Sequence, residues 1–398
     1  MKKRLLPPDI VVIVAGIVAA LHVGKLPPAL PVLREAMHMS LLESGFLLSL
    51  VQLAGMTVGV FVGLAADGAG PRRSILWGLG MLAVASGAGG FAREPWQLMA
   101  LRGVEGLGFL MTVLPVPGVL RALVPPERLS LRLGVWGAFM PTGTALALLC
   151  GPWVMLAAGW QGWWWLLAAI TALTLWLTAH SVPTDHAALH VATRAERHRW
   201  SARLSATLSA PGPWLIALTF AMYSSQWLSI VGFLPSIYAQ AGLSVAAAGA
   251  LTALVAAVNA LGNIGAGRLL HAGVAPSRVL AIGFCTMALC AVLAFAWPQA
   301  PLALRFAAVV LLSGVGGLVP GTLFPLAVRL APNLQTVSTT VGWLQQFSAL
   351  GQFSGPPLVA YVAGIAGGWQ WTWVVTGGAS LLGLGFALAT GRLLRRRA

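Results

Sequence analysis

The sequence predicts an all-α membrane protein with twelve transmembrane helices in two six-helix bundles. Hydrophobic residues make up 58% of the 398 residues, charged residues make up 8%, and the mean hydropathy is +0.85. A soluble domain carries roughly a quarter charged residues, and a disordered chain is poor in hydrophobic ones. Both classes are therefore excluded. Because one span needs about 20 apolar residues, the chain has room for about a dozen spans joined by short loops.

Twelve apolar runs, separated by clusters of charge, proline or glycine, are the expected spans. They are too long and too continuous for the strands of a membrane β-barrel, which alternate over about ten residues. The first six lie at about 10–33, 41–66, 74–92, 96–122, 131–157 and 163–182. The other six lie at about 214–239, 244–266, 279–297, 302–329, 338–364 and 369–391.

A long polar segment divides these runs into two sets of six. We therefore expect an N-terminal bundle at 1–182, a cytoplasmic linker at 183–213 and a C-terminal bundle at 214–398. The two halves also share landmarks, since the stretch 39–45 aligns with 243–249 and the same offset places Gly63 on Gly267. Such repeats are typical of transporters that rock two bundles about a central site. Chance similarity between helices rich in glycine and alanine is the alternative.

Basic residues give the orientation. With the N-terminus inside, 19 Lys and Arg residues fall in cytoplasmic segments, and only Arg34, Arg93 and Arg305 fall outside. The positive-inside rule therefore places both termini in the cytoplasm, in a bacterial-type inner membrane. The net charge of +15 would indicate nucleic-acid binding in a soluble protein. Here it reflects topology and contact with anionic lipid, so we expect no nucleic-acid partner.

The loop after the second span contains, in this order but not consecutively, a glycine, an aspartate, a second glycine and two arginines, namely Gly63, Asp67, Gly70, Arg72 and Arg73. This order resembles the motif that the major facilitator superfamily carries between those helices, although Gly68 stands where the family has a basic residue. The resemblance implies the major facilitator fold, alternating access and a gating role for this loop. The second half keeps the glycine as Gly267 but has His271 in place of the aspartate.

Further stretches resemble motifs of the same superfamily. Arg102 and Glu105 match its arginine-containing fourth helix, with Glu105 where a glutamine is common. The Gly-Pro pair at 151–152 matches part of the motif of proton-driven exporters, but the glycines that normally follow it are absent, which weakens an exporter interpretation. The segments 134–136 and 234–238 resemble the cyanate-transporter branch.

Charged groups inside spans are costly and usually functional. At 1.5 Å per residue, Lys25 lies roughly 12 Å below the outer surface, Arg102 about 9 Å and Glu105 about 13 Å. His22 lies one turn further in than Lys25, on the same helix face. The sequence contains no acid after Glu196, so the second half cannot supply a carboxylate. Among the acids of the first half, Glu105 is the one expected well inside a span.

The superfamily resemblance places the first and fourth spans beside the central cavity. A basic cluster short of acids suits an anion. We therefore expect His22, Lys25 and Arg102 to bind substrate, and Glu105 to couple transport to protons. The alternatives are that Lys25 extends to the outer headgroups and that His22 is a packed polar residue. Arg102 and Glu105 would then form a purely structural pair on one helix.

The second half offers neutral candidates for substrate contact on its first and fifth spans, namely Tyr223, Gln226, Trp227 and Gln346. Hydrogen bonding between helices explains most buried amides and is the alternative interpretation. Trp163, Trp164 and Trp165 are predicted to form an aromatic belt at the outer membrane interface.

Together these features predict a secondary active transporter of a small anionic organic or inorganic solute, coupled to protons and functional as a monomer in the bilayer. The main alternative is a proton-antiporting exporter of drugs or hydrophobic metabolites, and a non-transporting membrane sensor is a distant one. The sequence has no metal-ligand spacing, phosphate-binding loop or catalytic triad, so we expect neither enzymatic activity nor a cofactor.

Overall fold

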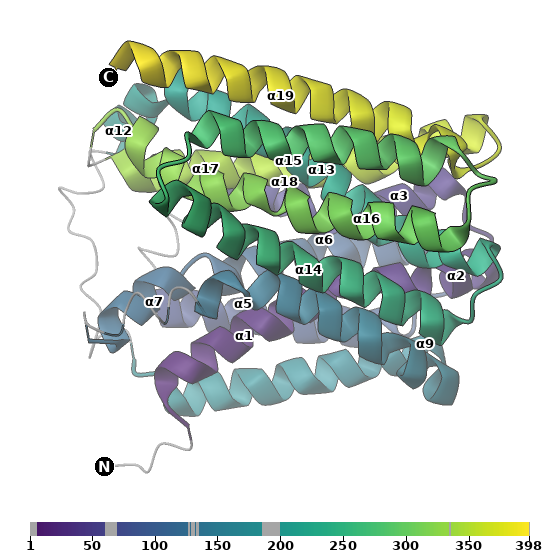
Figure 1. Cartoon of the computed structure of the whole chain (residues 1–398). Helices are drawn as coiled ribbons and strands as arrows, with labels where there is room; N and C mark the ends of the chain where they lie inside the picture. The colour runs from purple at the N-terminus through teal and green to yellow at the C-terminus, as the bar shows by residue number, and fades with distance from the viewer. Residues whose placement is uncertain are drawn as a thin grey trace.

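The computed structural model describes residues 6–59, 70–125, 128, 132, 135–184, 200–333 and 336–397. Within these residues the secondary structure is helical throughout, with no strand. Long helices lie side by side along one common direction (Figure 1). A helix satisfies most of its backbone hydrogen-bonding groups within itself, as a lipid environment requires.

The N-terminal half begins with two short helices that together make the first span. In chain order its helices are α1 (Pro8–Gly24), α2 (Leu26–Ala36), α3 (Leu41–Ser49), α5 (Pro71–Gly89), α6 (Pro95–Val113), α7 (Val116–Leu123) and α9 (Phe139–Ser181). A 3-10 turn, η1 (Leu50–Gln52), carries α3 onward into a helical stretch that reaches Gly59.

The C-terminal half follows a short helix in the predicted linker, α12 (Trp200–Leu208). Its helices are α13 (Pro211–Gln240), α14 (Val245–His271), α15 (Pro276–Ala291), α16 (Leu302–Gly316), α17 (Leu318–Leu330), α18 (Val337–Ile365) and α19 (Thr372–Arg397). A π-helical turn, η2 (Val292–Ala296), extends α15, and a 3-10 turn, η4 (Trp369–Trp371), precedes α19.

The predicted count of twelve spans agrees with this helix order. Nine helical stretches in the described residues are long and apolar enough to cross a membrane. One of them, the 43-residue α9, is two spans folded back on each other at Gly159, where φ is +69°. Only glycine adopts that conformation readily, so one residue makes the turn. Counting the two legs of α9 separately, and adding the less apolar α5 and α18, gives twelve spans in two six-helix bundles.

The two bundles pack together at the end of the molecule opposite the start of α1 and the end of α19, which we call the closed end (Figure 1). There α2 packs on α13, α3 on α18, and the first leg of α9 on α14. Gly45 and Gly249 make close approach possible. A Cβ at Gly45 would lie 2.8 Å from the Cα of Pro357, and one at Gly249 would lie 2.6 Å from the carbonyl oxygen of Leu148.

The tight contact at Gly45 predicts that a bulky side chain there opens the closed end. Gly45→Leu should lengthen the distance between spin labels at positions 93 and 299, which lie in loops of different bundles at that end. Electron paramagnetic resonance on a variant without native cysteines measures this distance. Gly103→Leu is the matched control, because a Cβ at Gly103 meets nothing within 4 Å. Equal lengthening in both variants, or none in Gly45→Leu, would contradict the role of this contact.

Candidate functional site

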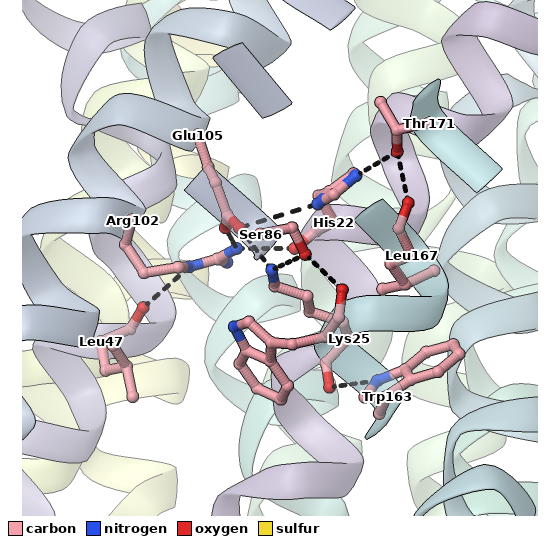
Figure 2. Close-up of polar contacts among 10 residues, drawn as sticks. His22, Lys25, Leu47, Ser86, Arg102, Glu105, Trp163, Leu167 and Thr171 are labelled. Carbon is pink, nitrogen blue, oxygen red and sulfur yellow. Dashed lines mark hydrogen bonds and ion pairs between the residues drawn. The ribbon is translucent and has the colours of Figure 1, made fainter. Parts of the chain in front are cut away.

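Four ionisable side chains meet inside the N-terminal bundle (Figure 2). His22 lies in the last turn of α1, Lys25 lies at the junction of α1 and α2, and Arg102 and Glu105 lie one turn apart on α6. Each of the four side chains is at most 2% exposed. We call these residues the charged cluster. The structure therefore brings together the four residues that the sequence selected from two distant helices.

A break in the first span shapes the cluster. Pro27 and Pro28 have no backbone N–H to donate to the preceding turn, so the helix is interrupted at Lys25. Two side chains bind carbonyl groups at this break. Arg102 Nη1 donates to the carbonyl oxygen of His22 at 2.6 Å, and Trp163 Nε1 donates to that of Lys25 at 3.2 Å. These two bonds fix α6 and α9 against the first span beside the break.

Glu105 is the centre of the cluster. Its Oε1 atom pairs with Lys25 Nζ, and its Oε2 atom accepts a hydrogen bond from Arg102 Nη1 at 2.7 Å. His22 Nδ1 lies 3.7 Å from Oε1. With His22 neutral, two cations face one carboxylate, so the cluster carries one net positive charge. An uncompensated charge in a low-dielectric interior is costly, and an anion that binds before a proton does would relieve that cost.

Lys25 is held from several sides. Its Nζ atom donates to Ser86 Oγ at 3.1 Å, and Ser86 Oγ donates in turn to the carbonyl oxygen of Trp164 at 2.9 Å. The same Nζ atom lies 4.7 Å from the centre of a Trp164 ring, a distance at which a cation–π attraction is effective. Lys25 is 0% exposed, so in this conformation it does not extend to the membrane surface.

The prediction of an aromatic belt is wrong for two of the three tryptophans. Trp163 and Trp164 are each 2% exposed and contact Lys25, whereas Trp165 is 43% exposed. The reason is the single-residue turn at Gly159, which starts the second leg of α9 earlier than the predicted loop allows. Trp163 and Trp164 therefore lie about one helical turn into the second leg of α9, inside the bundle.

The orientation of His22 follows from its hydrogen-bond partners. Its Nε2 atom lies 2.8 Å from Thr171 Oγ1, and this hydroxyl donates its proton to the carbonyl oxygen of Leu167 at 2.7 Å. The hydroxyl must therefore accept from Nε2–H, which assigns the proton of the neutral ring to Nε2. The Nδ1 atom is left facing Glu105, and protonation of His22 would occur there.

Two buried nitrogens of the cluster have no hydrogen-bond partner among the described residues, namely Arg102 Nη2 and His22 Nδ1. Buried polar groups in folded proteins are nearly always satisfied, so an orphaned guanidinium nitrogen needs an explanation. A bound anion would supply the missing acceptor for Arg102.

The structure places three predicted candidates of the second half in contacts within the C-terminal bundle. Tyr223 accepts a hydrogen bond from Asn259 Nδ2 at 2.8 Å, and Trp227 Nε1 donates to Ser313 Oγ at 3.3 Å. Gln226 Oε1 accepts from the hydroxyl of Ser380 on α19 at 2.8 Å. These bonds join neighbouring helices, and none of them reaches the charged cluster. A substrate contact by these three residues stays a prediction.

Gln346 lies at the contact between the two bundles. Its Nε2 atom donates to the carbonyl oxygen of Met56 at 2.8 Å, and a second bond between the bundles joins Gln52 Nε2 to Gln352 Oε1 at 3.1 Å. Any sliding of α18 against the second span must break these bonds. Movement between the bundles would therefore change the hydrogen bonding of Gln346.

The predicted gating motif is described only in part. Gly63 and Asp67 lie outside the described residues, whereas Gly70, with φ of +98°, immediately precedes α5. Arg72 donates to the carbonyl oxygens of Ala179 and Val182 at 2.6 and 3.0 Å, at the end of α9. A cation suits the negative end of a helix dipole. Arg73 is exposed beside it.

Sequence reasoning missed Ser86, Trp164 and Thr171. Small hydroxyl residues in apolar spans usually bond to their own helix, so nothing in the sequence separates Ser86 and Thr171 from ordinary ones. Trp164 lies in a run of three tryptophans, and this run is typical of the membrane interface. Its place beside Lys25 can be predicted only when the turn at Gly159 is known.

Two six-helix bundles that meet at one end, with buried charges next to the contact, are the architecture of an alternating-access carrier. The family model described as Major Facilitator Superfamily matches residues 12–347. The chain therefore belongs to the Major Facilitator Superfamily, a family of membrane transporters, and it is not an enzyme. The predicted fold and family are confirmed.

Individual relatives are more distant. The chain is 27% identical over 256 residues to the cyanate transport protein CynX of Escherichia coli (strain K12), covering 60% of each chain. It is 25% identical over 161 residues to the tetracenomycin C resistance and export protein of Streptomyces glaucescens, covering 40% of this chain and 30% of the relative. The match thus spans less than two thirds of either relative's length.

A solved structure of similar fold is a bacterial homolog to the human lysosomal transporter Spinster in an inward-facing and occupied conformation. The TM-score is 0.80 with 15% identity, covering 96% of each chain. At this identity the likeness concerns the fold alone.

The electrostatics of the cluster predict unequal effects on stability. Glu105→Gln leaves two buried cations facing each other without a carboxylate, and removing one partner of a buried pair costs roughly 3–5 kcal/mol. Lys25→Met leaves the neutral Arg102–Glu105 pair and should cost less. Thermal unfolding in detergent should rank the wild type first, Lys25→Met second and Glu105→Gln last, with Lys25→Met/Glu105→Gln above Glu105→Gln alone. A double variant less stable than Glu105→Gln would show that charge balance does not govern this site.

Proposed function

We propose that this protein is a secondary active transporter of a small anion, coupled to protons, in a bacterial inner membrane with both termini in the cytoplasm. The observation that carries the proposal is the net positive charge of the buried cluster together with the orphaned Arg102 Nη2 atom. The partial likeness to a cyanate transport protein supports an anionic substrate.

The anion would enter by competing with Glu105 for its two cations. Lys25 and Arg102 both bind Glu105 in the empty protein, so an anion that reaches them releases the carboxylate. A released carboxylate in an apolar interior favours its protonated form. Anion and proton would then be carried together, and the cluster would keep the same net charge with and without its cargo. A constant net charge lowers the electrostatic barrier to movement of the bundles.

Glu105 suits the coupling role because the alternatives are few. The sequence has no acid after Glu196, so the C-terminal bundle cannot supply a carboxylate. Within the described residues of the N-terminal bundle, Asp9 pairs with Arg132 at 2.9 Å near the start of α1, far along the helix from His22. His22 Nδ1 faces Glu105 and offers a second atom through which a proton can pass.

The closed end defines the stage of the cycle. With the termini in the cytoplasm, the contact of α2 with α13, and of α3 with α18, lies on the outer side of the charged cluster. The protein is then in an inward-facing or occluded state. Transport would alternate this state with one in which the closed end parts.

The substrate proposal predicts that Lys25→Ala weakens anion binding by about tenfold or more, because a charge-assisted hydrogen bond contributes roughly 1.5–3 kcal/mol. Proteoliposomes containing the purified protein and radiolabelled cyanate, tested in competition with other small anions, measure this effect. Ser86→Ala, which removes a neutral partner of Lys25, is the matched control and should change affinity far less. Unchanged affinity in Lys25→Ala would remove this residue from the binding site.

The coupling proposal predicts a different result for Glu105→Gln. This variant should bind and exchange the anion across the membrane, but an imposed pH gradient should no longer drive accumulation. Exchange and gradient-driven uptake are compared in the same proteoliposomes, with Glu105→Asp as the control that keeps a carboxylate. Full proton-driven accumulation by Glu105→Gln would rule out the coupling role.

An exporter of hydrophobic compounds is the second candidate, supported by the partial likeness to an export protein and by the Gly-Pro pair at 151–152. Inverted vesicles separate the two. Proton-dependent uptake of a fluorescent hydrophobic dye into inverted vesicles, with no transport of small anions, would favour the exporter and contradict the anion carrier.

A further inference from the structure

A hollow lies away from the charged cluster, in the C-terminal bundle. It is a cavity of about 780 Å³ between the turn that joins α14 to α15, the last turns of α17 and the last turns of α19. These helix ends lie at the end of the molecule where α19 ends, opposite the closed end (Figure 1). The cavity shares no lining residue with the charged cluster.

Three arginines from three different helices line this cavity, namely Arg278 on α15, Arg329 on α17 and Arg395 on α19. All three are exposed, and none forms an ion pair with a described residue. The sequence contains no Asp or Glu after Glu196, so the C-terminal bundle cannot neutralise them from its own side chains. Among the residues that the structure describes, the three positive charges that line the cavity therefore have no compensating acid.

The start of α15 adds to this positive field. The helix begins at Pro276 inside the cavity, and Ala275 before it provides no side chain to cap the first turn. The N-terminal end of a helix carries a partial positive charge. Pro276 has no N–H, and the amides of Arg278 and Val279 donate to the carbonyl oxygen of Ala275, so the amide of Ser277 is the one that can face an anion. The hydroxyl of Ser277 lies in the same turn, close to Gly391 of α19.

The walls of the cavity have the opposite character. They are largely aliphatic and comprise Leu270, Val274, Ala281, Leu326, Leu388 and Leu394. Leu388 is 51% exposed on the outer surface of α19, so the wall continues onto the face that the bilayer covers. A ligand that fills this space must be anionic at one end and apolar along its length, which excludes a small soluble anion as the best fit.

We propose that this cavity binds an anionic phospholipid, with its phosphate group between Arg278, Arg329 and Arg395 and its acyl chains along the aliphatic wall. Three arginines favour a lipid with two phosphates, such as cardiolipin, over one with a single phosphate. Basic pockets between membrane helices are suited to such headgroups. The bound lipid joins the ends of α15, α17 and α19, and so stabilises the C-terminal bundle. The inference does not depend on the proposed transport function.

Native mass spectrometry of the full-length protein in detergent tests the proposal, with cardiolipin, phosphatidylglycerol and phosphatidylcholine added in turn. The test variant is Arg278→Gln/Arg329→Gln/Arg395→Gln. The matched control is Arg268→Gln/Arg392→Gln/Arg396→Gln, which removes the same charge from exposed residues outside the cavity lining. We expect the bound fraction of cardiolipin to fall at least tenfold in the test variant and less than twofold in the control. Equal losses in both variants would mean general attraction to charge and would overturn the proposal.

Two further measurements separate the remaining explanations. Ala281→Phe fills the apolar wall without changing charge, and it should reduce lipid binding while leaving the unfolding temperature without lipid within a few degrees. Cardiolipin should raise the unfolding temperature of the wild type, and inorganic phosphate should not. Equal stabilisation by phosphate, or full cardiolipin binding by Ala281→Phe, would overturn the lipid assignment. If the test variant unfolds at a much lower temperature than the control, single Arg329→Gln and Arg278→Gln variants replace it, and unchanged lipid binding in both contradicts the proposal.

Discussion

The interior of the N-terminal bundle depends on the carboxylate of Glu105. Two cations from different helices would repel each other at this depth, and the two oxygens of one carboxylate hold both of them. The local structure serves this arrangement. Pro27 and Pro28 interrupt the first span, and the carbonyl groups of His22 and Lys25 beside the break accept hydrogen bonds from side chains of α6 and α9. Any event that moves the carboxylate must therefore loosen the contacts of three helices together.

The two bundles have different chemistry. The N-terminal bundle buries Lys25, Arg102 and Glu105, whereas the C-terminal bundle has no acid in its sequence and buries neutral hydrogen-bonding groups such as Tyr223 and Asn259. Neutral groups satisfied by neighbouring helices make a body that can shift without separating charges in an apolar medium. Among the described residues, the buried charges therefore all lie in the N-terminal bundle.

Much of the fold and part of the site could be predicted from the sequence. The length of apolar runs determines the number of spans, and equal depth along antiparallel helices brings Lys25 level with Glu105. The place where the chain turns between two spans is not contained in run lengths, so the turn at Gly159 and the burial of Trp163 and Trp164 were missed. The same limit applies to Tyr223, since the sequence shows a polar group in a span but not the neighbouring helix that it faces.

The turn at Gly159 has a consequence for how movement spreads. One leg of α9 packs on α14 of the other bundle, and the other leg carries Trp163, Trp164 and Thr171 of the cluster surroundings. A connection of one residue restricts the movement of the two legs relative to each other, whereas longer loops join most other spans. A displacement of one leg is therefore expected to move the other leg as well. A displacement of the first leg, where the bundles meet, is expected to change the positions of the residues on the second leg that contact Lys25 and His22.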